Sequence, residues 1–267
     1  MLFAKDDQYE LPLPKEAKFT GSKVFISALS LAIGLTLVFA GFETVAPFVL
    51  LLLGVCWNFF CDFNSWVAFV FGFCNSFLFA IFAYQTGLYM SGNLYVLFYI
   101  PLQFIVCLTM KHKKNFIINK DKTMSITKEF EVFGISVFAF VLFGMAGSTM
   151  EGQLYPWLDS LCAVMLGLSA YLQSYSYKEY FFVRIMALTL NIGLWIVVGV
   201  NYGFGLGMLS IILMYITYLI YAIVQFVEWY RTFYVKHEPS DSGEEFDKET
   251  RKIIDKKVEE YNKVNRK

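Results

Sequence analysis

Eight apolar stretches divide the chain, and each has about the length that a helix needs to cross a membrane, roughly 17–25 residues. The stretches are Val24–Ala40, Thr44–Phe60, Trp66–Tyr84, Leu94–Met110, Phe133–Met150, Trp157–Leu172, Tyr180–Val200 and Gly203–Val227. The second, third and sixth are the shortest or the most interrupted. Because stretches of this length favour membrane-spanning helices, we predict an all-α integral membrane protein.

The composition agrees with a membrane-embedded body. Of the 267 residues, 57% are hydrophobic and 16% are charged, whereas about a quarter are charged in an ordinary soluble protein. Residues 236–267 alone hold nine acidic and nine basic side chains, which predicts a soluble tail. A net charge of zero without a basic stripe disfavours a nucleic-acid partner. Two histidines give little for metal or proton chemistry, so we expect no metal and no cofactor.

The basic residues predict the orientation of the chain. They occur in the N-terminal segment, in the loop at 111–132, around Lys178 and from Arg231 onward, and with eight spans all four places lie on one side. Lys and Arg near span ends stay in the cytoplasm, so we expect both termini there. The connections on the opposite side carry no Lys or Arg, and their charged residues are all acidic: Glu43, Glu151 and Asp159.

A weak internal repeat relates the two halves of the chain. A shift of 116 residues lays spans two to four onto spans six to eight, and it superposes four pairs of residues: Glu43 and Asp159, Asn75 and Asn191, Gly87 and Gly203, and Tyr99 and Tyr215. Since three spans are an odd number, the single span between the groups restores a parallel orientation. We predict a seven-helix core of 3+1+3 parallel repeats plus one extra N-terminal transmembrane helix. Transporters with parallel repeats bind substrate near the midplane between the halves.

These boundaries divide the chain into seven segments. They are a cytoplasmic N-terminal segment (1–23), the extra N-terminal helix (24–41), the first three-helix repeat (42–110), a basic cytoplasmic loop (111–132), a linker helix (133–150), the second three-helix repeat (151–231) and a charged cytoplasmic C-terminal helix (232–267). Ser242 and Glu245 form a capping box for the last helix. Its apolar stripe fits packing on the cytoplasmic face or pairing with a neighbouring subunit equally well.

A few amides lie inside the predicted spans. Polar side chains at this depth usually face the bundle interior or a water-filled cavity. Asn75 and Asn191 occupy equivalent places in the two halves, and Gln103 follows Tyr99 by one helical turn. Hydrogen bonds between helices would explain each Asn taken singly. Two mirrored amides near one axis can also converge on a ligand, which is the reading we favour for the pair.

Aromatic residues and one cation complete the candidates. Trp195 lies one turn after Asn191, and side chains four residues apart share a helix face, which suits a flat ligand. Arg184 is the one cation within a span, and snorkelling to the interface would explain it as well as a substrate contact. Trp66 lies at a span end, where an aromatic belt is usual. Further flat surfaces come from tyrosines: Tyr84, Tyr89, Tyr95, Tyr99, Tyr202, Tyr215 and Tyr218.

Two missing patterns narrow the function. There is no phosphate-binding GxxxxGK[ST] motif, so we expect no ATPase domain in this sequence. No series of Asp, Glu and His residues runs through the spans, which argues against a proton relay and against an intramembrane enzyme. A facilitator for a neutral or singly charged aromatic solute fits this pattern better than a coupled pump. A non-transporting assembly subunit is the other alternative.

Three motifs in the first half resemble the PnuC-type vitamin transporters. They are Gly72-Phe73-Cys74-Asn75, Tyr84-Gln85-Thr86-Gly87-Leu88-Tyr89 and Tyr99-Ile100-Pro101-Leu102-Gln103-Phe104-Ile105, and the similarity covers about residues 45–230. The resemblance implies a homotrimer of seven-span cores in the bacterial inner membrane, with an optional extra N-terminal helix. It also implies facilitated diffusion of nicotinamide riboside or a related B vitamin, which a separate cytoplasmic kinase then traps.

The chain departs from that family where substrate is usually bound. Phe181 and Arg184 stand at two tryptophan positions of the family and Leu188 at an asparagine, while Asn191 lies nearly one turn later and could replace the amide. Thiamine and riboflavin are therefore alternative solutes. Resemblance and pattern together predict eight substrate-binding residues: Trp66, Asn75, Tyr99, Gln103, Phe181, Arg184, Asn191 and Trp195.

Overall fold

The computed structural model describes residues 21–62, 66–105, 124–174, 177–204 and 207–233. The predicted C-terminal helix beyond residue 233, most of the basic loop and nearly all of the N-terminal segment lie outside the described residues. The chain forms two units, residues 1–223 and residues 224–267. Only residues 224–233 of the second unit are described, and they are helical.

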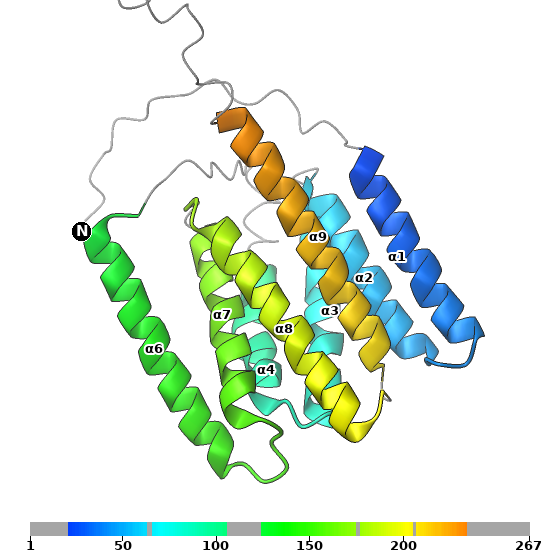
Figure 1. Ribbon diagram of the computed structural model, residues 1–267, viewed down its shortest axis with the longest axis horizontal. Helices are drawn as coiled ribbons and strands as arrows, with labels where there is room; N and C mark the ends of the chain where they lie inside the picture. The colour runs from blue at the N-terminus through cyan, green and yellow to red at the C-terminus, as the bar shows by residue number, and fades with distance from the viewer. Residues whose placement is uncertain (1–20, 63–65, 106–123, 175–176, 205–206, 234–267) are drawn as a thin grey trace, which may run out of the picture. The chain divides into compact units, whose positions relative to one another are not determined.

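The regular structure of the described residues is helical, and each predicted span contains a helix (Figure 1). The elements are α1 (Gly21–Phe39), α2 (Val45–Asp62), α3 (Val67–Gln85), α4 (Tyr89–Leu94), the π-helix η1 (Tyr95–Tyr99), α6 (Ile126–Thr149), α7 (Pro156–Ser174), α8 (Tyr180–Tyr202) and α9 (Met208–Phe233). Residues 100–105 continue η1 as an α-helix. Residues 89–105 thus form one helical run with a π-helical turn inside it, and the last residues of the fourth predicted span lie outside the described residues.

Five of the described helices are long and apolar enough to cross a membrane. They are α1, α3, α6, α8 and the Met208–Tyr230 part of α9, and α2 adds a shorter apolar helix at Val45–Cys61. This is the construction of a multi-pass membrane protein, as the sequence predicts. The hydrocarbon core cannot hydrogen-bond a free backbone, and a helix satisfies its own N–H and C=O groups.

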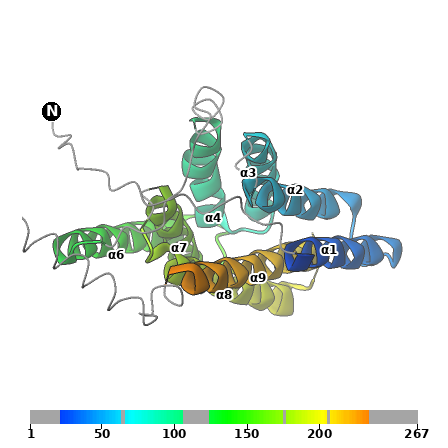
Figure 2. The same ribbon diagram turned by 90° about the horizontal axis from the view of Figure 1, so that it is seen from above.

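Neighbouring helices in the first unit pack mainly in sequence order. Helix α2 packs on α1 and α3, α7 packs between α6 and α8, and α4 bridges the two groups by contacting α3 and α7. Figure 2 shows α4 between α3 and α7 from above. Hydroxyl contacts attach α1 to α9: the Ser27 and Tyr221 hydroxyls lie 2.5 Å apart, and Thr217 Oγ1 donates to Ser30 Oγ at 2.7 Å.

The core of the first unit is aromatic where α3, α8 and α9 meet. The Phe79 ring lies 5.8 Å from the Trp195 ring and 5.9 Å from the Tyr215 ring, both edge to face. Rings prefer this geometry because the positive edge of one meets the negative face of the other. All three side chains are buried. By contrast, only 17% of the apolar window of α6 is buried, so its large apolar side chains suit contact with lipid.

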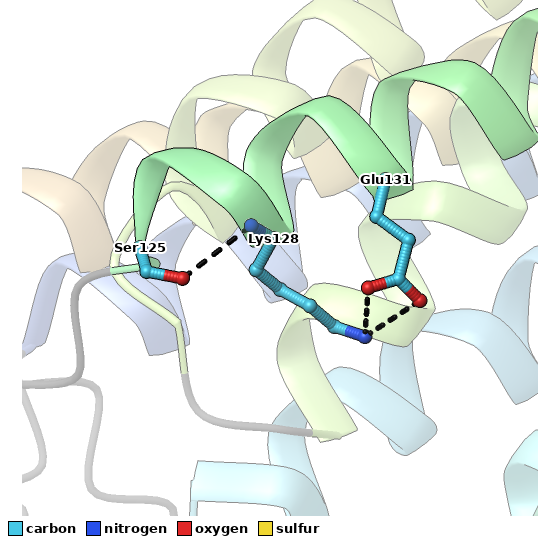
Figure 3. A network of polar contacts seen from close by, with 3 residues as sticks. All are labelled: Ser125, Lys128 and Glu131. Atoms are coloured by element: carbon cyan, nitrogen blue, oxygen red, sulfur yellow. Dashed lines mark hydrogen bonds and ion pairs between the residues drawn. The ribbon is translucent and has the colours of Figure 1, made fainter.

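Helix α6 begins at Ile126, well before the predicted start of its span at Phe133. The Ser125 hydroxyl accepts a hydrogen bond from the Lys128 backbone N–H at 3.4 Å, which caps the helix. The Lys128 ammonium also bonds the Glu131 carboxylate at 3.0 Å (Figure 3). A search for long apolar stretches misses these first turns because three of their seven residues are charged: Lys128, Glu129 and Glu131. The predicted basic loop therefore ends in helix.

Candidate functional site

A small cavity lies among the helices of the first unit and is partly open to solvent. Helix α2 contributes Trp57, α3 contributes three residues, and α8 contributes Arg184 and Leu188. The run from η1 to residue 105, α7 and α9 supply the rest. The lining residues other than those named are Gly72, Asn75, Ser76, Tyr95, Tyr99, Gln103, Leu166, Ser169, Tyr215 and Tyr218.

Five aromatic side chains form much of the cavity wall. Tyr95 and Tyr99, both on η1, stack with ring centroids 4.9 Å apart. The Trp57 and Tyr218 rings, which also line the cavity, meet edge to face at 5.7 Å. The Tyr215 hydroxyl lies 3.3 Å from that of Tyr95. Short π-helical turns are rare and frequently occur at functional sites, and η1 is the turn that carries two of these rings.

Two amide side chains also line the cavity. Asn75 is buried, and its Nδ2 donates to the Leu50 carbonyl at 2.9 Å, while Tyr218 donates to its Oδ1 at 3.5 Å. Gln103 is also buried. A Cβ at position 72 would lie 2.8 Å from the Gln103 side chain and 2.9 Å from the Trp57 ring. Glycine at position 72 therefore allows this amide and this ring to approach α3.

Three buried polar atoms of the lining residues have no hydrogen-bond partner among the described residues. They are the Nε1 donor of Trp57, the Oε1 acceptor of Gln103 and the Nε donor of Arg184. Buried polar atoms in proteins are nearly always paired, so each such atom calls for an explanation. Three of them around one cavity are the arrangement expected where a polar ligand or water binds.

Arg184 brings a positive charge to the cavity. Its guanidinium carbon lies 5.9 Å from the centroid of the Trp57 ring and 5.6 Å from that of Tyr180, which are cation–π distances. No carboxylate lines the cavity among the described residues. In the same part of the chain, no group of three or more His, Cys, Asp or Glu side chains could hold a metal ion.

Two carboxylates cap helices outside the cavity. Asp159, in the first turn of α7, accepts from the backbone N–H groups of Met90 and Ser91 at the start of α4, and also from the Ser91 hydroxyl. Glu43, just before α2, accepts from the backbone of Leu209 at 2.9 Å and of Ser210 at 3.3 Å, at the start of α9. Each acid satisfies N–H groups that have no partner within their own helix.

The comparisons with known proteins agree with this architecture. A family model described as Nicotinamide mononucleotide transporter matches residues 44–231. The chain belongs to this family. The match begins after α1 and covers every residue that lines the cavity. It also confirms the resemblance to PnuC-type transporters that three motifs of the first half predict.

A solved structure shares the fold of this family member. The crystal structure of the Vitamin B3 transporter PnuC superposes with a TM-score of 0.66, at 21% sequence identity, and covers 80% of this chain and 92% of that chain. No curated protein matches the sequence.

Four of the eight predicted site residues of this transporter line the cavity: Asn75, Tyr99, Gln103 and Arg184. The other four do not. Trp66, at the start of α3, is 46% exposed. Phe181 is buried against Tyr180, with ring centroids 5.4 Å apart. Trp195 is part of the aromatic core, and Asn191 Nδ2 donates to the Ala187 carbonyl of its own helix at 2.8 Å.

The spacing along α8 explains the last two placements. Arg184, Leu188, Asn191 and Trp195 follow one another at intervals of three or four residues, so they form one stripe. The cavity touches the first two and ends before Asn191. Asn191 Oδ1 and Trp195 Nε1 are nevertheless buried, and neither has a hydrogen-bond partner in the part of the chain that the structure describes. The sequence pattern identifies the correct helix face but not the depth at which the cavity ends.

Sequence reasoning did not identify Trp57, Leu166 or Ser169 as site residues. Trp57 lies three residues before the predicted end of its span at Phe60, where an aromatic residue of the membrane interface is usual, so its position does not single it out. Ser169 donates to the Leu166 carbonyl of its own helix, and nothing in the sequence distinguishes it from other serines within spans.

Proposed function

We propose that this family member carries a B vitamin across the membrane by facilitated diffusion and binds it in the cavity between α2, α3, α7, α8 and α9. The candidates are nicotinamide riboside and closely related vitamins, with thiamine and riboflavin as alternatives. The observation that carries the proposal is the cavity itself, because aromatic faces and three unpaired buried polar atoms lie together in a chain of a transporter family.

The chemistry of the lining fits a flat heterocycle. The stacked rings of Tyr95 and Tyr99 and the ring of Trp57 offer apolar faces to a planar ligand. Asn75 and Gln103 supply amide groups for its substituents, and Gln103 Oε1 has no other partner. A ligand pocket of this kind is mostly apolar, with a few polar groups that fix orientation.

Asn191 and Trp195 extend the proposed path of the solute. They continue the α8 stripe beyond the cavity, and each has a buried polar atom without a partner. We place a second, transient contact there, which the solute would make on its way between the two sides. Trp66 and Phe181, which the sequence predicts as substrate-binding residues, would then act at the margins of the path.

An uncoupled mechanism fits the absence of carboxylates from the described lining of the cavity. A proton- or sodium-driven carrier uses ionisable groups such as Asp, Glu and His at depth, and the one charged side chain among the described lining residues is Arg184. Net uptake would then require that a separate cytoplasmic kinase modify the solute.

The two carboxylate caps support the 3+1+3 arrangement. Glu43 begins the first triplet and caps the third helix of the second triplet, whereas Asp159 begins the second triplet and caps the third helix of the first. Such a reciprocal pair is what two parallel repeats about one axis would produce. By family likeness and by its basic residues, we propose a homotrimer in a bacterial inner membrane with cytoplasmic termini.

Uptake into liposomes tests this proposal. The purified full-length protein is reconstituted without any ion gradient and offered radiolabelled nicotinamide riboside, thiamine or riboflavin, with protein-free liposomes as the control. We expect saturable uptake of at least one vitamin that stops at equal concentrations on both sides. Uptake only with an imposed proton or sodium gradient would indicate a coupled transporter, and no uptake of any vitamin would favour an assembly subunit.

A further inference from the structure

We propose that α1 acts as a strap: its hydroxyl contacts with α9 hold the two repeats of the transporter together, part during each transport step and thereby slow transport. This inference rests on the proposed function, because it names a helix that sets the rate of that function. The family model matches residues 44–231, so α1 lies outside the part of the chain that the model matches.

The face of α1 that meets the rest of the bundle is small and polar. Among the described residues of this helix, those that are buried are Ser27, Ser30 and Gly34. They follow one another at intervals of three and four residues, so they lie on one face. Because lipid is as apolar as leucine, helices in a membrane associate through close packing and hydrogen bonds, and the buried face of α1 is suited to both.

On one side, hydroxyl groups join α1 to α9. Thr217 Oγ1 donates to Ser30 Oγ at 2.7 Å, and the hydroxyls of Ser27 and Tyr221 lie 2.5 Å apart. Tyr221 also donates to the Lys23 carbonyl at 3.0 Å. Both of the α9 side chains are buried. We call these contacts the hydroxyl row.

On the other side, α1 packs on α2 at Gly34. A Cβ at this position would overlap the Leu51 side chain and lie 3.2 Å from the Phe48 ring, so glycine permits the two helices to approach closely. In the proposed 3+1+3 arrangement, α2 begins the first triplet and α9 ends the second. Helix α1 therefore contacts both repeats.

The two helices that α1 joins also form part of the cavity wall. Trp57 on α2 and Tyr218 on α9 line the cavity, and their rings meet edge to face. Transporters built from repeats alternate their access largely by rocking one repeat against the other. Such a motion shifts α9 against α2, and α1 cannot keep its contacts with both helices while it occurs.

The hydroxyl row is the contact that can part at low cost. Ser27, Ser30 and Thr217 each also donate to the carbonyl four residues earlier in their own helix, at 2.8–2.9 Å. A hydroxyl that leaves its partner on the other helix therefore stays hydrogen-bonded in lipid, where a free polar group would be costly. Each hydrogen bond between membrane helices is weak, so the row resists separation without preventing it.

A reversible crosslink tests whether α1 and α9 must part. The full-length double variant Ser30→Cys/Thr217→Cys is oxidised with copper phenanthroline and reconstituted in liposomes, and mass spectrometry measures how much of it is joined. The assay follows exchange of radiolabelled nicotinamide riboside, or of thiamine or riboflavin if the wild type carries one of these instead. Each single variant, oxidised in the same way, controls for the native cysteines. We expect the joined protein to lose exchange and the reduced protein to regain it.

Removal of one hydroxyl tests whether the row slows transport. Thr217→Val keeps the branched shape of the side chain and removes the donor to Ser30. Thr36→Val is the matched control, because Thr36 is exposed on α1 and also donates to the carbonyl four residues earlier at 2.8 Å. We expect the initial exchange rate to rise about 3- to 15-fold in Thr217→Val, the range for one hydrogen bond between membrane helices. Thr36→Val should exchange at the wild-type rate.

Three results overturn the inference and leave the proposed function intact. They are exchange that continues in the joined protein, an exchange rate of folded Thr217→Val no higher than that of Thr36→Val, and cysteines that do not join, since α1 and α9 would then not lie side by side. If the wild type carries none of the vitamins, the proposed function fails together with the inference. Should the melting temperature show that Thr217→Val does not fold, Ser30→Ala takes its place.

Discussion

Gly72 shapes the cavity because glycine has no side chain. A Cβ at that position would contact the Gln103 amide at 2.8 Å and the Trp57 ring at 2.9 Å, closer than van der Waals distance. Both of those side chains carry an unpaired buried polar atom. The size of the cavity therefore depends on the glycine in α3 as much as on the residues that would touch a ligand.

The substitution Gly72→Ala should weaken vitamin binding. We expect an affinity loss of about tenfold, because overpacking of this size costs about 1–3 kcal/mol and displaces the Gln103 amide. Calorimetry with the transported vitamin measures it. Gly193→Ala is the matched control, since its Cβ meets nothing within 4 Å and it lies on the exposed side of α8. Equal affinity of Gly72→Ala and wild type would show that the ligand does not bind beside Gln103.

Gln103→Ala and Asn191→Ala should differ in their effects. Gln103→Ala removes a group of the cavity, so we expect affinity to fall by a factor of about 2 to 10, the range for one neutral hydrogen bond. Asn191→Ala should slow uptake and leave equilibrium affinity unchanged, because Asn191 lies beyond the cavity. Binding and initial uptake rates measured on the same preparations separate the two. A loss of affinity in Asn191→Ala would mean that the cavity extends further along α8.

At the scale of the elements, two acids attach the ends of helices to one another. Asp159 in α7 accepts from the first N–H groups of α4, and Glu43 before α2 accepts from those of α9. A negative charge at a helix N-terminus is favourable because the backbone dipoles add up there. These contacts fix where α4 and α9 begin and thereby position η1 and Tyr215 against the cavity.

Asp159→Ala should destabilise the protein by about 1–3 kcal/mol, because it leaves buried donors of Met90, Ser91 and Gln153 unpaired. Thermal unfolding in detergent reports the loss. Glu151→Ala is the control, since Glu151 is exposed and surface substitutions usually change stability by less than about 0.5 kcal/mol. Unfolding temperatures that fall equally for the two variants would contradict the cap.

The buried Glu43 carboxyl should make the stability of the folded protein depend on pH. Burial raises its pKa above the ordinary 4.5, although the N–H groups of Ser210 and Leu209 oppose the shift. The folded protein then binds a proton more tightly than the unfolded chain, so the stabilisation is full below pH 4.5 and lost as pH rises through the folded pKa. The stability of wild type relative to Glu43→Gln should therefore increase as the pH is lowered from the folded pKa to 4.5. A decrease, measured by thermal unfolding across that range, would contradict the buried carboxyl.

The sequence predicts helices better than their ends. Long apolar stretches locate the spans because hydrophobicity is a property of whole segments. The start of α6 depends instead on Ser125 and the Lys128–Glu131 pair, and the start of α4 on a carboxylate from α7. At the site, Asn75 and Gln103 could be predicted from depth alone. Trp57 and the point where the cavity ends depend on packing between distant helices.

At the scale of the whole molecule, the chain combines a vitamin transporter fold with a cavity of its own chemistry. The family model and the solved PnuC structure show the fold. The lining pairs aromatic rings with one cation, Arg184, and among the described residues no acid joins them. Uncoupled carriage of a planar solute is the activity that this combination fits best.

Solute counterflow tests that claim most directly. Liposomes that contain the full-length protein are loaded with an excess of one unlabelled candidate vitamin and diluted into a trace of the same vitamin with a radioactive label, with equal ions on both sides. The account predicts that label enters transiently above its external concentration for at least one vitamin. No such accumulation for any candidate, or accumulation only with an imposed ion gradient, would contradict it.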